Sequence, residues 1–492
     1  MITIQSIRRW DSTETIDLVL DVSGGPRHVD GGAGAAHPGE RTATTVVDGT
    51  GYVLAPGLAD PHVHFRDPGQ TRKESMLSGS RAAAAGGYTR VLIMPNTQPP
   101  LDGRTPRPDE PGADEIRDSH CHDAIEYLQR YESLHDLRLP VHYDLAVCAS
   151  IGRAGHEASR PEDWSRYMVP NVAADRHPVT FMSDDGAAVT DGILDQVLAN
   201  ASVAGLTLLE HCEHHDHGVM NEGAVSRRLG YPGVPESTER SIVWRDIQAC
   251  RRTGVPIHFQ HVSTASSFDL IRRAKADGLP ITCETAPHYL ALCDEDVERY
   301  GALAKMNPPL RSEHDRLATL AAIADGTVDM LATDHAPHTE AEKRADFLEA
   351  PNGVIGLETA YGVCHHALVD GGYIDDLRLI ELMATAPTRF LGYEPTDVEP
   401  LLQTRPDCER RVLDLHALLE RPRRLGRGID PAAVNLTILA PQEHWTVDPN
   451  HFQSKARNTP FAGWQVTGRP VATILDAQLV FNGIAQHSTQ GA

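Results

Sequence analysis

Two histidines that are two positions apart, His62 and His64, are the first residues whose types and spacing could do chemistry. They lie in the segment Asp60–Gly69, which follows the apolar run Tyr52–Leu54. Side chains two apart on a strand point to the same face, so both imidazoles can reach one ion. Such a pair suits zinc or a similar borderline metal. Taken alone, the pair could equally be a chance match on a surface turn.

Four further segments place a histidine or a carboxylate at the end of a short apolar run. They are Phe181–Gly186 with Asp184 and Asp185, Leu208–His211, His258–Thr264 with His258 and His261, and Leu331–His338 with Asp334 and His338. Each segment alone is more commonly a capped loop or a buried histidine. Together they put ligands at successive strand ends, as a metal site in a barrel requires. Because His258 and His261 are three apart, only one of them is expected to face inward.

Strand-like and helix-like patterns alternate from Pro56 to about residue 395, and these elements must position the candidate ligands. The apolar runs include Arg90–Met94, Leu206–Glu210, Pro256–Gln260, Pro280–Glu284 and Val328–Ala332, and the helical patterns include Leu194–Ala204 and Ser266–Asp277. Alternation over this length predicts an α/β fold, a (β/α)8 TIM-like barrel. Enzymes of this architecture carry their sites at the C-terminal ends of the strands.

Strand-like runs also flank this region on both sides. They are Met1–Gln5, Ile16–Val22 and Thr44–Leu54 before it, and Asn435–Leu439 and Val471–Leu475 after it. We expect them to pair into a small β-sandwich domain formed by both termini. The predicted division is 1–56 for the N-terminal part of that domain, 57–398 for the barrel, and 399–492 for a C-terminal extension and the rest of the small domain. Leu101–His120 and Pro400–Gly428 are predicted to be exposed insertions.

Composition limits the classes of function. The 492 residues include 45 basic and 68 acidic side chains, for a net charge of -23. Such a field repels phosphate backbones and anionic membrane surfaces, so we expect no nucleic-acid or membrane partner, and an anionic substrate needs local basic residues. The sequence shows no apolar run of about 18 residues and no evident signal peptide. Its eight cysteines lack CxxC spacing, which favours free thiols and a cytoplasmic location.

These motifs resemble the amidohydrolase superfamily and, within it, the bacterial class I dihydroorotases. The resemblance runs from about Val53 to Tyr361 and resumes at Ser454–Gly463. It implies a (β/α)8 barrel with a small β domain made from both termini, and a zinc cofactor of one or two ions per chain. It also implies reversible hydrolysis and cyclisation between dihydroorotate and N-carbamoyl-aspartate in de novo pyrimidine biosynthesis, by metal-activated hydroxide.

The resemblance assigns six residues to the metal site. His62 and His64 match the first metal pair, Asp185 matches a carboxylate that can bridge two zinc ions, His211 and His261 match the ligands of the second metal, and Asp334 matches the catalytic acid and base, which also touches the first metal. Many amidohydrolases bridge their metals with a carboxylated lysine instead. The segment before Ser183 offers no lysine, so Asp185 is the bridge that this sequence provides.

The resemblance also assigns substrate contacts. Arg66 and Asn96 match residues that hold the carboxylate of dihydroorotate, and a guanidinium is a natural bidentate partner for that group. Further matches are Asn307, His338, Asn352 and Gly353. Arg66 could instead pair only with Asp67 or Asp60, and Asn96 could only cap a turn. Hydantoinases and dihydropyrimidinases share the metal ligands, but the resemblance implies that they lack this Arg and Asn pairing.

Other functions stay open at this point. A hydantoinase, dihydropyrimidinase or allantoinase would act on a related cyclic amide. An inactive homologue would serve as a structural partner of aspartate transcarbamoylase, but such a chain is expected to lose metal ligands and this one keeps all six. A solenoid or binding protein is disfavoured because the sequence has no internal repeat. An active enzyme could also associate with the transcarbamoylase or form a homo-oligomer.

Overall fold

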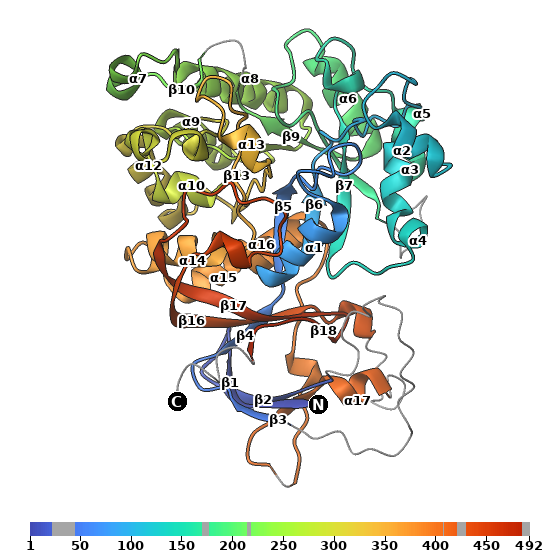
Figure 1. The fold of residues 1–492 in the computed structure, drawn as a ribbon, viewed down its shortest axis with the longest axis vertical. Coiled ribbons are helices and arrows are strands. Elements are labelled where there is room, and N and C mark those ends of the chain that lie inside the picture. Colours follow the sequence, from blue (N-terminus) through green and yellow to red (C-terminus); the bar gives the residue numbers. More distant parts are fainter. Residues whose placement is uncertain (22–44, 170–176, 214–217, 407, 421–429, 485–492) are drawn as a thin grey trace.

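The structure, a computed structural model, describes residues 1–21, 45–169, 177–213, 218–406, 408–420 and 430–484. It contains a barrel of parallel strands surrounded by helices and a smaller sheet built from both ends of the chain (Figure 1). Within the described ranges, no helix has the length and apolar character needed to span a bilayer.

The strands of the barrel follow one another around the ring in chain order. Among the described residues they are β5 (Leu58–Val63), β6 (Tyr88–Ile93), β7 (His142–Cys148), β8 (Val179–Ser183), β9 (Thr207–His211), β12 (Ile257–Gln260), β13 (Ile281–Thr285) and β14 (Met330–Leu331). The ring closes where Val63 forms a parallel bridge with His335, beside a 2.9 Å hydrogen bond from His64 N to His335 O. The predicted α/β class and (β/α)8 barrel are confirmed.

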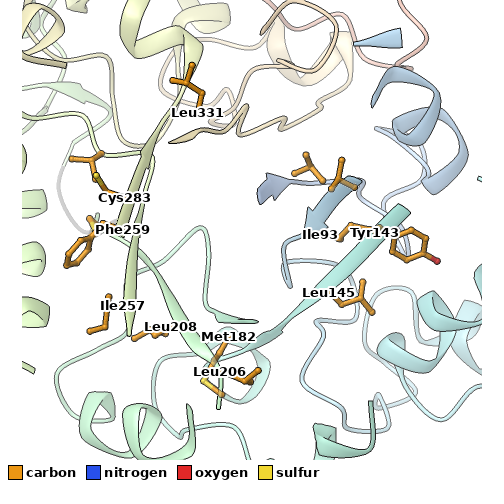
Figure 2. Close-up of a cluster of buried hydrophobic side chains, with 14 of the residues drawn as sticks. Ile93, Tyr143, Leu145, Met182, Leu206, Leu208, Ile257, Phe259, Cys283 and Leu331 are labelled. Atoms are coloured by element: carbon orange, nitrogen blue, oxygen red, sulfur yellow. The ribbon is translucent and has the colours of Figure 1, made fainter. Parts of the chain in front are cut away.

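Helices cover the outer face of the barrel. They include α1 (Met76–Ala85), α6 (Leu194–Ala204), α8 (Ser237–Thr253), α9 (Ala265–Ala276) and α12 (Glu313–Ala324). Side chains alternate along each strand, so Ile257 and Phe259 of β12 join the outer hydrophobic core. Figure 2 shows such side chains, among them Phe259 and Tyr143, on the outer side of the ring of strands. The intervening strand positions are thereby left to face the interior.

The helices that follow the strands begin at residues that suit the N-cap position. Ser75 accepts a hydrogen bond from Ser78 N at the start of α1, and Thr264 accepts one from Ser267 N at the start of α9. Each cap satisfies a backbone donor that the helix leaves unpaired. The loops that carry the candidate ligands therefore end at defined positions.

The smaller sheet joins strands from both ends of the chain. Its order is β15 (Val412–Asp414), β2 (Thr15–Leu20), β1 (Ile2–Arg9), β4 (Val53–Pro56), β16 (Leu436–Thr446), β17 (Gln465–Leu475) and β18 (Gln478–Asn482), with β3 (Thr45–Asp48) paired to β1. In Figure 1, β16–β18 and β1–β3 form two layers, and Ile4, Leu18 and Ile438 lie in their shared core. The predicted small β-sandwich domain is confirmed, whereas its boundaries at residues 56 and 398 stay a prediction.

The stretch Leu101–His120 is only partly the exposed insertion that its composition predicts. Leu101 and Asp102 are buried, and the stretch contains α2 (Ala113–Asp118), whose residue Ile116 lies in the core. The prediction was wrong for these residues because a composition rich in proline and charge does not reveal local anchors. One such anchor is Asp102, which accepts a 2.9 Å hydrogen bond from Gly152 N.

The second predicted insertion, Pro400–Gly428, contributes structure to the small domain. It contains β15 and α17 (Leu415–Glu420), and Leu415 and Leu418 are buried in the core of that domain. Residues 407 and 421–428 of this stretch lie outside the described residues.

Candidate metal centre

All six predicted metal ligands meet at the C-terminal ends of the barrel strands. His62 lies near the end of β5 and His64 just beyond it, Asp185 follows β8, His211 ends β9, His261 follows β12, and Asp334 follows β14. All six side chains are buried. A site shared among five strands forms only when the barrel is closed.

Asp185 lies between the four histidines of this set. Its Oδ1 atom is 3.2 Å from His62 Nε2 and 3.4 Å from His211 Nδ1. The same oxygen is 3.6 Å from His261 Nε2, and Oδ2 is 3.3 Å from His64 Nε2. The carboxylate therefore contacts histidines of both pairs, as a ligand that bridges two metal ions would.

Asp334 faces the first histidine pair. Its Oδ1 atom lies 3.1 Å from His64 Nε2 and 3.6 Å from His62 Nε2. Burial opposes ionisation, but the hydrogen bond from His64 and the charge of His62 lower the pKa of Asp334 to about 2. Burial likewise opposes ionisation of Asp185, and the surrounding histidines hold its pKa well below the ordinary value. Both carboxylates are anionic at neutral pH.

These donor atoms fit a cation. Within the described part of the chain, the buried atoms His62 Nε2, Asp185 Oδ1 and His261 Nδ1 have no hydrogen-bond partner. The ligand atoms of His62, His64 and Asp334 lie within 4.8 Å of one another, and so do those of His62, Asp185 and His261. A buried polar atom without a partner costs about 1–3 kcal/mol, which coordination of a metal ion would offset.

A second layer of polar side chains orients the imidazoles. Glu284 Oε1 lies 2.8 Å from His62 Nδ1, and Asn96 Oδ1 lies 2.8 Å from His64 Nδ1. Because both partners accept hydrogen bonds, each fixes a proton on Nδ1 and leaves Nε2 as the ligand atom. Asn96 thus does more than cap a turn.

His258 and His261 both face the interior of the barrel, so the expectation that only one does was wrong. β12 ends at Gln260, and His261 has a φ of +35°, which takes it out of the strand alternation and turns it toward Asp185. His258 lies within the strand, 3.1 Å from Glu284 Oε2. The alternation of side chains along a strand therefore does not predict the direction of a residue that lies beyond the strand's end.

Sequence reasoning missed two buried residues of this centre, Glu284 and His288. Glu284 links His62 to His258, and burial, outweighed by these two histidines, leaves its pKa at about 2. His288 lies in α10 (Pro287–Ala291), and burial lowers its pKa to about 4 while the charge of Asp334 opposes that shift. Glu284 lies near the end of β13 and His288 lies three residues beyond it. A polar side chain at the end of an apolar run, the pattern that identified the other ligands, was therefore present here too.

Arg66 and Asn307 border the metal centre from the loops after β5 and β13. Asn307 Nδ2 lies 3.0 Å from His211 Nε2. Arg66 Nε donates a 3.3 Å hydrogen bond to Pro337 O. Among the described residues Arg66 forms no ion pair, and Asp67 instead accepts a hydrogen bond from Met76 N at the start of α1. The alternative pairing of Arg66 with Asp60 or Asp67 is not observed.

His338, Asn352 and Gly353 form one loop cluster beside Arg66. His338 Nε2 donates a 2.8 Å hydrogen bond to Asn352 O. Gly353 has a φ of +132°, and a Cβ atom there would lie 2.8 Å from Ala336 Cβ, so the close approach of these loops requires glycine. The Asn352 side chain is exposed, which leaves its backbone to face the cluster.

Comparisons with known proteins identify the family of this chain. A model of the amidohydrolase family matches residues 53–396. The dihydroorotase of Citrifermentans bemidjiense is 35% identical over 487 residues, which cover 97% of this chain and 99% of that protein. The dihydroorotase of Lactiplantibacillus plantarum is 37% identical over 435 residues, or 87% of each chain.

Solved structures share the fold at lower identity. An L-hydantoinase (dihydropyrimidinase) from Arthrobacter aurescens has a TM-score of 0.65 at 22% identity, and covers 98% of this chain and 96% of its own. A D-hydantoinase has a TM-score of 0.67 at 20% identity, with 98% and 95% covered. With the full-length matches above, the chain belongs to the amidohydrolase family and, within it, groups with the dihydroorotases.

Proposed function

We propose that this chain is a zinc-dependent dihydroorotase, which interconverts dihydroorotate and N-carbamoyl-aspartate in pyrimidine biosynthesis. The observation that carries the proposal is the combination of two features. Asp185 lies among four buried histidines, and Arg66 forms no ion pair with any carboxylate in the described ranges. The first feature suits hydrolysis of an amide, and the second suits a substrate that carries a carboxylate. The full-length similarity to dihydroorotases supports both.

The metal site would use the six residues in two groups. His62, His64 and Asp334 would hold one zinc ion, His211 and His261 would hold a second, and Asp185 would contact both. Bound zinc supplies Lewis-acid polarisation of a carbonyl and lowers the pKa of water, so that a nucleophile is available near neutral pH. Imidazole and carboxylate donors are the ligands that zinc accepts in catalytic sites.

The chain's own residues then handle the proton and the substrate. Water attacks the ring amide carbonyl, and the amide C–N bond breaks. Asp334, anionic and 3.1 Å from His64 Nε2, accepts the proton of the attacking water and passes it to the departing ring nitrogen. Arg66 and Asn96 hold the ring carboxylate, while His338 and the backbone at Asn352 and Gly353 position the ring.

A substitution of Asp334 by asparagine tests the proton transfer. Asp334→Asn keeps the shape of the side chain but cannot accept the proton, so kcat should fall by about a hundredfold to ten-thousandfold. Zinc content is measured on the same samples, because His62 and His64 remain. Full activity with zinc bound would contradict the assignment of Asp334 as the base.

Substrate choice separates this proposal from related cyclic amidohydrolases. Hydantoin and dihydrouracil lack the carboxylate that Arg66 would bind, so turnover of dihydroorotate should exceed turnover of either. A preference for the uncharged rings would favour a hydantoinase or dihydropyrimidinase. If the purified protein contained no zinc and had no activity, the result would instead favour an inactive homologue that serves as a structural partner of aspartate transcarbamoylase.

Two further properties belong to the same proposal. The eight cysteines are free, which supports a reducing, cytoplasmic location. Association with aspartate transcarbamoylase or with further copies of this chain would be tested by co-purification and by measuring the mass of the assembly in solution.

A further inference from the structure

Arg153 lies in the loop after β7 and is neither one of the six candidate metal ligands nor one of the predicted substrate contacts. The loop is fixed by two buried carboxylates, since Ser150 N donates to Asp184 Oδ1 at 2.9 Å and Gly152 N donates to Asp102 Oδ2 at 2.9 Å. Arg153 itself has a φ of +57°, which non-glycine residues adopt rarely. A backbone conformation of this kind persists where its surroundings impose it, and it often occurs at functional sites.

The guanidinium of Arg153 reaches the substrate end of the metal centre. Gly186 directly follows the ligand Asp185, and a Cβ atom on Gly186 would lie 2.8 Å from Arg153 Nη2 and 3.9 Å from Asn96 Nδ2. The absence of a side chain on Gly186 therefore lets the Arg153 guanidinium lie directly against the backbone beside Asp185, with the Asn96 amide on the same side. Asn96 Oδ1 is occupied by His64, so its Nδ2 is the atom that remains to donate.

Arg153 has no anionic partner within the part of the chain that the structure describes. Its Nε atom is buried without a hydrogen-bond partner, and no carboxylate lies within ion-pair distance of the guanidinium. Arg66, which follows the nearby strand β5, also forms no ion pair among the described residues, although its Nε donates to Pro337 O. Burial lowers the pKa of Arg66 to about 10, and the positive charge of Arg153 acts in the same direction.

Arg66, Asn96 and Arg153 are half-buried, and the two guanidinium groups repel each other, so a bound carboxylate would offset that repulsion and accept hydrogen bonds from all three side chains. Arg66, Asn96 and Arg153 follow β5, β6 and β7, which are adjacent in the barrel. We propose that Arg153 is a second carboxylate-binding residue, which acts with Arg66 and Asn96 on the ring carboxylate of the substrate. This inference rests on the proposed function and deepens it.

The test compares Arg153→Ala and Arg153→Lys with the control Arg160→Ala. Arg160 lies in the same segment but pairs with Glu157 on the surface. Loss of a charge-assisted hydrogen bond should raise the KM for dihydroorotate and for N-carbamoyl-aspartate by about 10- to 100-fold. Calorimetry with orotate, which carries the same ring carboxylate, should show a similar rise in Kd. Zinc content and kcat should change little.

Arg153→Lys keeps the positive charge but loses the planar guanidinium. Its KM and its Kd for orotate should therefore lie between those of wild type and of Arg153→Ala. It also decides the question if Arg153→Ala does not fold. An unchanged KM and orotate Kd with a lower kcat or lower zinc content would make Arg153 a counter-ion of Asp184 and Asp185, and would overturn the inference. So would equal effects from Arg160→Ala. Zinc-loaded wild type without dihydroorotate turnover would instead refute the proposed function, and this inference with it.

Discussion

At the residue scale, His62 shows how the metal centre is oriented. Its Nε2 atom faces Asp185 and Asp334, and its Nδ1 atom faces Glu284. Glu284 also contacts His258, whose Nδ1 lies 2.7 Å from Thr282 Oγ1. These polar contacts continue into the barrel interior. The direction in which His62 Nε2 points therefore depends on Glu284, which contacts the other nitrogen of the ring and is not one of the six candidate ligands.

Glu284→Gln should therefore weaken zinc binding. The amide keeps the size of the side chain but loses the charge that fixes a proton on His62 Nδ1, and loss of such outer partners costs about 10- to 100-fold in metal affinity. The measurement is a competition titration of zinc against a chelator. Glu313→Gln, which alters only a surface pair with Arg316, is the matched control. Equal zinc affinity in both variants would show that Glu284 does not orient His62.

Much of this centre could be predicted from the sequence because its signal is local. His62, Asp185, His211 and Asp334 each stand at or just past the end of an apolar run, and a parallel barrel brings such ends together. The inward turn of His261 could not be predicted, since it depends on a φ of +35° after the last strand residue. Nor could the position of Arg153, because its loop is anchored by residues from two other parts of the chain.

At the scale of the elements, two glutamates that stand just before barrel helices bind the segment between β16 and β17. Glu74, just before α1, accepts hydrogen bonds from Ser454 Oγ and Lys455 N. Glu358, just before α14 (Ala360–Cys364), accepts them from Gln453 N at 2.9 Å and Ser454 N at 3.0 Å. These contacts join residues 95 to 381 positions apart, so no local pattern in the sequence predicts them.

Glu358 should make stability depend on pH in an identifiable way. Burial raises its pKa from 4.5 to about 7, although two backbone hydrogen bonds oppose the shift. The folded chain thus binds a proton more readily than the unfolded chain. The stabilisation from Glu358 is fully present below about pH 4.5 and is lost as the pH rises through about 7.

Glu358→Gln removes this dependence while keeping an acceptor oxygen. The free energy of unfolding of the variant minus that of wild type should increase by about 2 kcal/mol between about pH 5.5 and about pH 8, because only wild type loses stability over this range. Urea unfolding in the presence of a chelator measures it without a contribution from bound metal. Glu349→Gln, in an exposed nearby loop, should show no such change. A parallel pH dependence in wild type and Glu358→Gln would refute the assignment.

At the scale of the whole molecule, a segment between two strands of the small domain contacts the loops beside the candidate metal centre. The chain that connects its strands β16 and β17 reaches the loops of the barrel, where Asn458 is buried. Asn458 Oδ1 accepts a 3.0 Å hydrogen bond from His338 N, and Nδ2 donates at 3.1 Å to both Ala336 O and Gly353 O. One amide thus joins both loops that are expected to contact the substrate ring.

Asn458→Ala should consequently affect binding and stability together. It leaves three buried backbone groups without partners, at about 1–3 kcal/mol for each group that water cannot reach. The urea midpoint should fall, and the KM for dihydroorotate should rise because His338 and Gly353 are no longer held at a fixed separation. Asn450→Ala controls for the loss of an amide from the same segment, because the exposed Asn450 side chain hydrogen-bonds to Asp448 alone among the described residues. If Asn458→Ala lowered the midpoint but left KM unchanged, the segment would stabilise the junction of the two domains without positioning the substrate loops.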